Sequence, residues 1–459
     1  MATRQQSETI SMAERVSSMA EVKRGLKPHQ ALAEAARCLF CHDAPCVKGC
    51  PVGIDIPGFI RRIAQRNTIG AARLIRQSNP LGSICARVCP AESLCEKSCT
   101  SSGIAQPIAI ADLQRYATDQ ELARGIPPMK CAASTGRNVA VVGAGPAGLT
   151  CAVSLASQGE SVTVFDRWAE PGGTMRYGIP AYRLPREILA AESVWVLSTG
   201  VKFVPSTEIG RDISFDELVS GYDAVFICAG LGQPENPRLP GDDVAGVASA
   251  YSFLRFASDP GSRAGMRSTD IPDPLGRVVV LGGGNVAVDA ACVAARLGAD
   301  SVTIAYRRSE AEMPAWPGEV EFAREEGVEF RFLLSPSEVL GSEGKVVGVK
   351  MARMRLLAAD GSSRPKPAPT GEPDELLGAD TVVLAFGQGP NEAVFRGMPG
   401  LVRGDSGMIR IDPFTGATSV PGVFAGGDAA NGGTTVVRAV REGLAAAAGI
   451  RGYLDSRVS

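Results

Sequence analysis

The residues best suited to chemistry in this sequence are cysteines, and they lie close together near the amino-terminal end. Eight of the 12 cysteines fall between residues 38 and 99. The first group runs from Cys38 to Cys50 with the spacing C-x2-C-x4-C-x3-C-P, and the second runs from Cys85 to Cys99 as C-x3-C-P followed by C-x3-C. Met1–Ser7 is polar and lacks the apolar core of a signal peptide, so we expect a reducing cytoplasm. There, clustered thiols bind metals rather than form disulfides.

Two metal chemistries are compatible with these thiols. Zinc sites usually show two separated C-x2-C pairs, whereas here the gaps vary and proline follows Cys50 and Cys89. Proline after the last cysteine of a run is typical of ferredoxin spacing, in which that cysteine binds the other cluster. We therefore expect iron–sulfur clusters, with two zinc knots as the alternative, and the spacing leaves the partition of ligands open. The four remaining cysteines are expected to be small structural residues: Cys131, Cys151, Cys228 and Cys292.

Elements that could hold a dinucleotide follow the cysteines. Residues 139–142 predict a buried parallel strand, which leads through a G-x-G-x-x-G turn into a helix over 149–158. A second strand over 161–165 ends in Asp166, an acid suited to ribose hydroxyls. The turn glycines are Gly143, Gly145 and Gly148. An ordinary strand-to-helix turn is the alternative, but the full order of strand, turn, helix, strand and acid favours a dinucleotide site, with the pyrophosphate at the helix N-terminus.

Two further segments fit the other side of such a cofactor. The glycine-rich loop over 171–180 could run along it, although a plain surface turn is equally compatible. A strand over 422–426 leads through Gly427 to Asp428 and then to a helix beginning near Thr434. A solvated aspartate is the alternative there, but the preceding glycines favour a cofactor contact. The apolar stretch 223–229 predicts another central parallel strand.

The same pattern then repeats. Residues 277–281 predict a strand that enters a G-x-G-x-x-A turn with Gly282, Gly284 and Ala287, and the polar stretch 257–275 before it is a plausible domain boundary. The partner strand over 301–305 ends in Tyr306-Arg307-Arg308 without a carboxylate. Arginines there offer forked donors to a 2′-phosphate, which favours NADP(H) over NAD(H), unless both side chains face only water.

Bulk properties exclude several partners. The 459 residues suffice for about three domains, and no apolar run approaches the length of a membrane span. A formal charge of −2 gives no electrostatic reason to expect nucleic acid or anionic membrane as a partner. With only two histidines, His29 and His42, histidine acid–base catalysis is not expected.

These motifs together resemble the electron-input subunit of NADPH-dependent glutamate synthase and the matching N-terminal half of dihydropyrimidine dehydrogenase. The resemblance runs from Cys38 to about Tyr453 and includes Ser78-Asn-Pro-Leu-Gly82 and Ala425-Gly-Gly-Asp428. It implies an α/β fold with two Rossmann-like, adrenodoxin-reductase-like domains behind an α-helical iron–sulfur domain. The expected domains are 1–130 for two [4Fe–4S] clusters, 131–245 with 391–459 for FAD, and 246–390 for NAD(P)H.

The resemblance also implies site residues. One cluster would be held by Cys38, Cys41, Cys46 and Cys99, and the other by Cys50, Cys89, Cys95 and Gln114, with Cys85 as a bystander. The expected FAD contacts are Gly143, Gly145, Pro146, Ala147, Gly148, Asp166, Gly173, Thr174, Arg183, Ile209, Gly427, Asp428, Thr435 and Val436. The expected NADPH contacts are Gly282, Gly284, Asn285, Val286, Ala287, Arg307, Arg308, Ala385, Phe386 and Gly387. No catalytic side chain is expected, because the cofactors carry out the hydride and electron transfers.

The sequence thus predicts an enzyme that oxidises NADPH, with NADH possible, and passes electrons through FAD and two clusters to a partner subunit carrying its own flavin (FMN) or iron–sulfur centre. Gln114 resembles the pyrimidine branch, so we expect a hetero-oligomeric dihydropyrimidine dehydrogenase. Tyr306-Arg-Arg with Met313-Pro314 looks more like glutamate synthase, which remains the alternative. A stand-alone ferredoxin–NADP reductase-like enzyme and a non-catalytic zinc-and-nucleotide scaffold also stay open.

Overall fold

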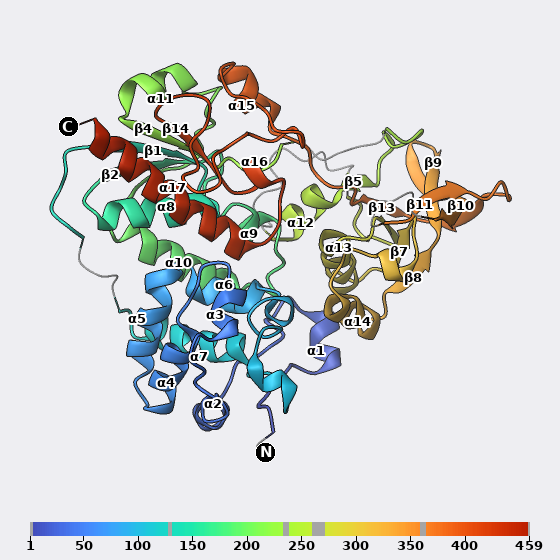
Figure 1. Ribbon diagram of the computed structural model, residues 1–459. Coiled ribbons are helices and arrows are strands. Elements are labelled where there is room, and N and C mark those ends of the chain that lie inside the picture. Colours follow the sequence, from blue (N-terminus) through green and yellow to red (C-terminus); the bar gives the residue numbers. More distant parts are fainter. Residues whose placement is uncertain (1–2, 127–130, 233–237, 259–270, 359–363, 458–459) are drawn as a thin grey trace.

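The computed structural model describes residues 3–126, 131–232, 238–258, 271–358 and 364–457. The chain forms an amino-terminal helical part, a parallel sheet whose last strand comes from the carboxyl-terminal end, and a second parallel sheet inserted before that strand (Figure 1). The expected fold class, two Rossmann-like units behind a helical part, is confirmed. The boundary expected over 257–275 lies mostly outside the described residues.

The helical part has an apolar core of its own. Helix α4 begins after Asp55, whose side chain accepts a hydrogen bond from the Gly58 amide at 2.9 Å and so caps the helix. One face of α4 then buries Phe59, Ile60 and Ile63. The helices are α1 (Met12–Ser17), α2 (Pro28–Ala35), α3 (Pro45–Gly49), α4 (Ile56–Ala64), α5 (Thr68–Ser78), α6 (Gly82–Val88) and α7 (Ile110–Ala123), with 3-10 turns at Ala91–Ser93 and Thr100–Gly103.

The first parallel sheet has the strand order β14-β4-β1-β2-β3. Its central strand β1 is buried on both faces, because Val139 and Val141 point into one core and Ala140 and Val142 into another. Helices α8 and α17 pack together on the first of these faces. The elements are β1 (Asn138–Val142), α8 (Pro146–Ser157), β2 (Ser161–Phe165), α9 (Thr174–Tyr177), α10 (Arg186–Leu197), β3 (Lys202–Val204), α11 (Phe215–Gly221), β4 (Ala224–Ile227), α15 (Glu392–Gly397), β14 (Val423–Ala425), α16 (Asp428–Asn431) and α17 (Val436–Ser456).

The second parallel sheet has the order β5-β13-β6-β7-β8. Like the first, it has a central strand with apolar side chains on both faces. In β6, Val278 and Val280 pack against helices, while Val279 and Leu281 face the opposite side. The elements are β5 (Val247–Ser249), α12 (Ala250–Ser258), β6 (Arg277–Leu281), α13 (Asn285–Arg296), β7 (Ser301–Tyr306), a 3-10 turn at Glu310–Glu312, α14 (Pro317–Glu325), β8 (Glu329–Phe332) and β13 (Thr381–Leu384).

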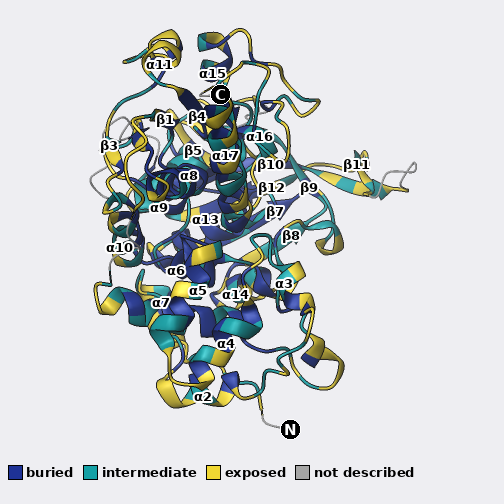
Figure 2. Cartoon of the chain, turned by 60° about the vertical axis from the view of Figure 1, so that its left-hand side comes forward, coloured by how far each residue is buried: buried dark blue, intermediate teal, exposed yellow. Residues whose placement is uncertain are grey.

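An antiparallel sheet that the sequence pattern did not indicate covers that opposite side. Its core residues Val339, Val349 and Met351 pack against Val279 and Leu281 of β6. The strands are β9 (Leu334–Ser342), β10 (Lys345–Leu357), β11 (Lys366–Pro369) and β12 (Glu375–Gly378). Figure 2 shows buried residues through α8 and α13, whereas β11 projects from the body with half-buried and exposed residues.

Helix α6 joins the helical part to the first sheet. Its residues Ile84 and Val88 belong to the same core as β1. The carboxylate of Glu192 on α10 accepts hydrogen bonds from the amides of Ser83 and Ile84, at 2.8 and 3.1 Å, so it caps α6 from the other part. Arg76 of α5 pairs with the same Glu192, so this joint is buried.

Candidate cofactor sites

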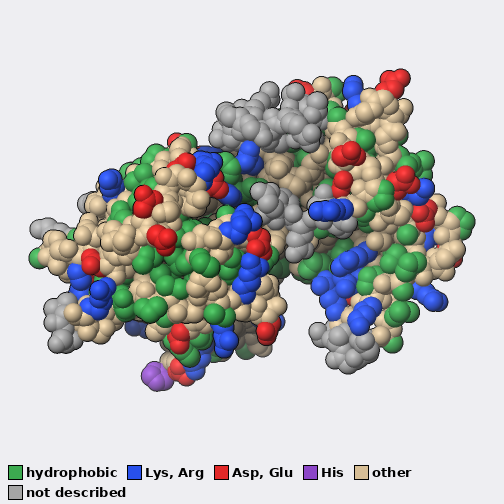
Figure 3. All heavy atoms as spheres, turned by 90° about the horizontal axis from the view of Figure 1, so that it is seen from above, with side chains coloured by type: hydrophobic (Ala, Val, Ile, Leu, Met, Phe, Trp, Pro, Cys, Tyr) green, Lys and Arg blue, Asp and Glu red, His purple; other side chains and the backbone are tan. Residues whose placement is uncertain are grey.

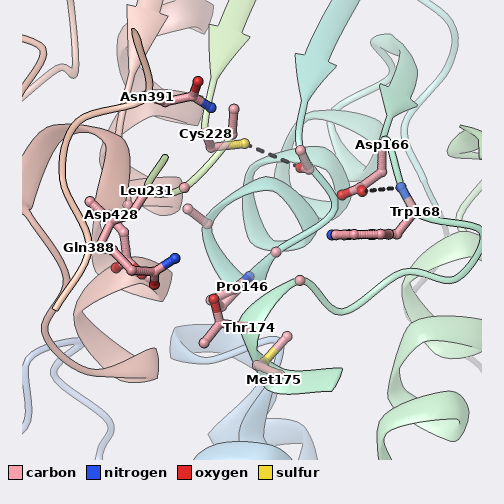
Figure 4. Close-up of a pocket in the computed structure, with 18 of the residues that line it drawn as sticks. Pro146, Asp166, Trp168, Thr174, Met175, Cys228, Leu231, Gln388, Asn391 and Asp428 are labelled. Atoms are coloured by element: carbon pink, nitrogen blue, oxygen red, sulfur yellow. Dashed lines mark hydrogen bonds between the residues drawn. The ribbon is translucent and has the colours of Figure 1, made fainter. Parts of the chain in front are cut away.

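A pocket opens at the carboxyl ends of the strands in the first sheet, where ligands bind in folds of this kind. Figure 4 shows Asp166 and Trp168 on one side of it, Gln388 and Asp428 on the opposite side, and Thr174 below. Thirteen of the 14 residues predicted to contact FAD line this pocket: Gly143, Gly145, Pro146, Ala147, Asp166, Gly173, Thr174, Arg183, Ile209, Gly427, Asp428, Thr435 and Val436. Their roles as FAD contacts stay predictions.

The glycine turn has the shape that a pyrophosphate needs. Gly143 has φ +115°, and a Cβ on it would lie 2.4 Å from the carbonyl oxygen of Cys228. Gly148, the predicted contact that does not line the pocket, packs against the turn, because a Cβ there would lie 1.9 Å from the Gly143 oxygen. A Cβ on Gly145 would meet no protein atom within 4 Å and would enter the pocket. The backbone at Gly145 is therefore open to the pocket, which fits the close approach of a dinucleotide phosphate.

Asp166 is held by the turn itself. Its Oδ2 accepts a hydrogen bond from the Ala144 amide at 2.6 Å and its Oδ1 accepts one from the Trp168 amide at 2.9 Å. Burial raises the pKa of Asp166, although both backbone donors favour its charged form. Each oxygen keeps a further lone pair, so the carboxylate can still accept a hydrogen bond from a hydroxyl group.

The far side of the pocket is built by Asp428 and the start of α17. Burial, and then the nearby Glu442, raise the pKa of Asp428. Glu442 accepts hydrogen bonds from the Gly427 amide at 2.6 Å and from the Asn431 side chain, which fixes the turn that carries Asp428. Thr435 caps α17, so the helix N-terminus lies beside the pocket.

The inserted sheet also contributes to the pocket. Asn285 and Val286, both predicted nucleotide contacts, line it from the start of α13. Asp289 and Trp316 line it as well and were missed. Asp289 lies one helical turn after Asn285, so helical spacing could have found it, whereas nothing in the sequence marked Trp316. The backbone amide of Trp316 donates to Asn285 Oδ1 at 2.9 Å.

Arg183 bridges the two sheet-bearing parts. Its guanidinium lies 2.8 Å from an Asp289 oxygen and 2.5 Å from a Glu319 oxygen. The residue was predicted as an FAD contact, and it does line the pocket, but its charge is directed to carboxylates of the inserted part.

The second glycine turn lies at the carboxyl ends of β6 and β13. A Cβ on Gly282 would lie 2.4 Å from the Ala385 oxygen, whereas one on Gly284 would meet nothing within 4 Å, so this turn also leaves its backbone open. The other predicted contacts, Ala287, Phe386 and Gly387, follow the same strand ends. Apart from Asn285 and Val286, none of the predicted NADPH contacts lines the pocket of the first sheet.

The arginines after β7 face outward. Arg307 is exposed, and Arg308 is half-buried and donates to the Pro365 oxygen at 3.0 Å. Arg364 joins them, because it donates to the Tyr306 hydroxyl at 3.0 Å. Arg364 comes from the unpredicted antiparallel insertion. Figure 3 shows Lys and Arg side chains gathered on the right-hand part of the molecule, beside the indentation that separates it from the larger left-hand part.

The eight clustered cysteines surround two separate cavities. One is lined by Cys38, Cys41, Cys46 and Cys99. The other is lined by Cys50, Cys85, Cys89, Cys95 and Gln114. The grouping is the one that the resemblance implied, except that Cys85 lies with the second group rather than apart from it. The assignment of ligands stays a prediction.

Burial disfavours the thiolate form of several clustered cysteines. Burial raises the pKa of Cys46 to about 11 and also raises the pKa of Cys38 and Cys50. A hydrogen bond with Cys85, together with burial, raises the pKa of Cys89. Such thiols become thiolates near neutral pH only beside a strong positive charge, such as bound iron. Among the described residues, no three His, Cys, Asp or Glu side chains converge on a point that could hold one metal ion.

Of the isolated cysteines, Cys151, Cys228 and Cys292 are buried, as expected for small structural residues, whereas Cys131 is exposed. Among the described residues no helix is both long enough and apolar enough to span a membrane.

Comparisons with known proteins match both parts of the chain. Residues 15–126 match the family described as "dihydropyrimidine dehydrogenase domain II, 4Fe-4S cluster". Residues 137–443 match the family described as "pyridine nucleotide-disulphide oxidoreductase". The chain is 38% identical to the glutamate synthase [NADPH] small chain of Halomonas elongata, over 96% of this chain and 94% of that protein.

It is 37% identical to the NAD-dependent dihydropyrimidine dehydrogenase subunit PreT of Escherichia coli K12, over 94% of this chain and 95% of that protein. Among solved structures, FprA of Mycobacterium tuberculosis in complex with NADPH has a similar fold, with a TM-score of 0.58 and 23% identity. That likeness covers 70% of this chain and 85% of FprA.

Proposed function

Because this chain belongs to the family of the glutamate synthase small chains and the dihydropyrimidine dehydrogenase subunit PreT, we propose that it is the electron-input subunit of a larger cytoplasmic enzyme. It is an NAD(P)H-dependent oxidoreductase, and its two family matches imply a 4Fe-4S cluster, FAD and a pyridine nucleotide. In the proposal it oxidises NADPH and delivers single electrons, through FAD and two [4Fe–4S] clusters, to a partner catalytic subunit.

The observation that carries the proposal is the adjacency of the sites. Val88 lines the flavin pocket, and the next residue, Cys89, lines the second cysteine cavity. On the other side, Val436 lines the flavin pocket and the next residue, Val437, lines the second cysteine cavity. The flavin pocket and the second cavity therefore adjoin, which would suit direct electron transfer between a flavin and a cluster bound in them.

When bound, FAD accepts a hydride from reduced nicotinamide and releases electrons singly, which iron–sulfur clusters can carry. The protein positions these groups. Asn285, Val286 and Trp316 bring the inserted part to the wall of the flavin pocket, where a nicotinamide can stack. The open backbone at Gly145 and Gly284 receives the two pyrophosphates.

Iron–sulfur clusters suit the cysteine cavities better than zinc does. A single zinc ion with bonds of about 2.3 Å needs closely converging thiolates. The described residues offer no such convergence, although four or more thiol and amide side chains line each cavity. A cubane cluster spreads its ligands further apart, which supports one [4Fe–4S] cluster in each cavity.

We assign the preference for NADPH to Arg307 and Arg308, now joined by Arg364. All three lie beside the end of β7, where the ribose of a nucleotide on the second glycine turn would lie. Guanidinium groups donate in a fork that matches a phosphate. No carboxylate ends β7 to favour the free ribose of NADH.

The partner that we propose reduces pyrimidines. Gln114 supports it, because its side-chain nitrogen donates to the Gly82 oxygen at 2.8 Å and leaves the amide oxygen for iron. The resemblance links glutamine at this position to the pyrimidine branch. Glutamate synthase is the second candidate, since Tyr306-Arg307-Arg308 resembles its small chains and the identities to the two branches differ by only one percentage point.

Anaerobic purification followed by a visible spectrum and iron and sulfide analysis tests the cofactors. We expect flavin and cluster absorbance between about 400 and 500 nm and eight irons per chain. Colourless protein would reject the proposal, because zinc is spectroscopically silent. A pull-down then tests the partner. A flavoprotein that reduces uracil supports the pyrimidine branch, a glutaminase-containing chain supports glutamate synthase, and activity toward a ferredoxin without any partner indicates a stand-alone reductase.

A further inference from the structure

Two carboxamide side chains line the second cysteine cavity. One is held through its nitrogen and the other through its oxygen. Gln114 uses its nitrogen as a donor to the Gly82 oxygen, so its oxygen is available to the cavity. Asn79 also lines the cavity and is fully buried, with 0% of its surface exposed. The Oδ1 of Asn79 accepts a hydrogen bond from the Leu81 amide at 3.1 Å. Since only an oxygen can accept from an amide, the orientation of the Asn79 side chain is set.

This orientation leaves the Nδ2 of Asn79 without a partner. No acceptor for it exists among the described residues, although the atom is buried. An unsatisfied buried donor costs about 1–3 kcal/mol, so a side chain of this kind is expected to have an acceptor in the working protein. The polar side chains that line the cavity together with Asn79 are the thiols of Cys50, Cys85, Cys89 and Cys95 and the carboxamide of Gln114.

We propose that Asn79 donates an N–H···S hydrogen bond to a sulfur atom of the cluster in the second cavity. The inference rests on the proposed function, because it requires a cluster there. The cluster gains one negative charge when it accepts an electron, and a fixed N–H donor stabilises the more negative state. Asn79 is therefore a positioning residue that raises the reduction potential of this cluster and helps it to accept electrons from the flavin.

The local sequence explains why the donor is held so firmly. Helix α5 ends at Ser78, and the Asn79 amide closes it by donating to the Ile75 oxygen at 2.8 Å. Pro80 follows and prevents the helix from continuing, after which α6 begins at Gly82. The Ser78–Gly82 motif, which had no assigned role, thus turns the chain between two helices and holds one donor toward the cavity.

Two variants test the donor together. Asn79→Asp keeps the oxygen that accepts from Leu81 and removes the N–H donor but adds a charge, whereas Asn79→Ala removes the donor without adding one. The measurement is the midpoint potential of each cluster, from a redox titration followed by electron paramagnetic resonance at pH 7 and pH 9. The higher pH ensures an ionised aspartate, because a neutral carboxyl could still donate. We expect the potential of the second cluster to become more negative while that of the first stays unchanged. Asn79→Ala, which also lacks the donor, should shift the potential in the same direction.

The matched control is Asn67→Asp. Asn67 is exposed at the opposite end of the same helix, and its oxygen caps that helix by accepting from the Gly70 amide at 2.9 Å. This variant should keep both potentials. Because the charge of an ionised aspartate lowers the potential by itself, a shift in Asn79→Asp supports the proposal only if the uncharged Asn79→Ala shifts in the same direction. A wild-type potential of the second cluster in either variant overturns the proposal.

A second measurement uses the wild-type protein and so does not depend on a variant that retains the cluster. The wild-type protein is labelled with 15N only in the asparagine side-chain amide, and hyperfine spectroscopy is recorded on the reduced second cluster. Coupling to the labelled nitrogen is expected, since Asn79 is the asparagine that lines this cavity. Its absence would overturn the proposal. If iron and sulfide analysis instead finds no second cluster in the wild-type protein, the proposed function itself fails.

Discussion

Gly145 and Gly148 belong to one turn, but a side chain at each would meet different surroundings. Gly145 has φ −75° and open space where a Cβ would stand, so Gly145→Ala should fold normally and bind FAD at least about tenfold more weakly, which is about 1.4 kcal/mol. Gly148→Ala would place a Cβ against the Gly143 oxygen and should cost about 1–3 kcal/mol of folding stability. Flavin content and the thermal unfolding of the flavin-free proteins separate the two effects.

Equal loss of stability in both variants would show that Gly145 serves only the packing of the turn. Retention of full flavin content in Gly145→Ala would place the cofactor elsewhere.

We expect the arginines after β7 to determine the preference for NADPH over NADH. In Arg307→Ala/Arg308→Ala we expect the KM for NADPH to rise at least about tenfold, because two charge-assisted hydrogen bonds to a 2′-phosphate are lost. The KM for NADH should change little. Steady-state kinetics with an artificial electron acceptor measure both constants without the partner subunit.

Arg73→Ala is the matched control, because Arg73 is exposed on α5 in the helical part. A parallel loss for both nucleotides in the double variant would mean that the arginines support the fold of the second sheet rather than a phosphate.

At the scale of elements, the junction between the two sheet-bearing parts contains a half-buried carboxyl group, that of Glu319. Burial raises the pKa of Glu319 to about 7, with Asp289 and Glu92 adding to the rise and Arg183 opposing it. One oxygen of Glu319 is buried without a hydrogen-bond partner. The folded protein therefore keeps a proton that the unfolded chain loses near pH 4.3.

The sign of the pH effect follows from this difference. The stabilising contribution is complete below the unfolded pKa of about 4.3 and is lost as the pH rises through about 7, with an upper limit of about 4 kcal/mol. We expect the unfolding temperature of the wild-type protein to fall by several degrees more than that of Glu319→Gln between pH 5 and pH 8. Calorimetry at constant ionic strength measures it. Parallel pH profiles for the two proteins would show that Glu319 titrates normally.

The elements that the sequence predicted well are those whose pattern follows from burial. Strands such as β1 and β6 are buried on both faces and so are apolar after their exposed first residues, and the G-x-G turns mark where they end. The antiparallel sheet lacks both signals, because β9 and β11 contain Pro, Gly or Ser and β10 alternates with exposed positions. Arg364 was missed for the same reason, since it comes from that insertion.

The grouping of the cysteines could not be predicted from their spacing. Spacing alone left their partition open, because Cys99 joins Cys38, Cys41 and Cys46 only after the helices fold around α4. The resemblance, not the spacing, separated the two groups. Even so, it gave no reason to expect Cys85 inside the second cavity or an unpaired amide at Asn79, which became visible only from the packing of α5 and α6.

At the scale of the whole molecule, the three sites lie in an order that implies a direction. The flavin pocket adjoins the second cavity through Val88 and Cys89, whereas Leu39, between two cysteines of the first cavity, is 49% exposed. Electrons should therefore pass from the flavin to the second cavity, then to the first, and leave the protein near Leu39.

Two single substitutions test that order in the intact protein. Cys99→Ser should remove the first cluster, and Cys95→Ser the second, while NADPH still bleaches the flavin at the wild-type rate in both because the pocket is unchanged. In Cys99→Ser, NADPH should still reduce the second cluster. In Cys95→Ser, the first cluster should stay oxidised with NADPH yet be reducible with dithionite. Rapid-freeze electron paramagnetic resonance follows each cluster, with Cys131→Ser, an exposed thiol, as control. NADPH reduction of the first cluster at the normal rate in Cys95→Ser would mean that the flavin reaches it by another route.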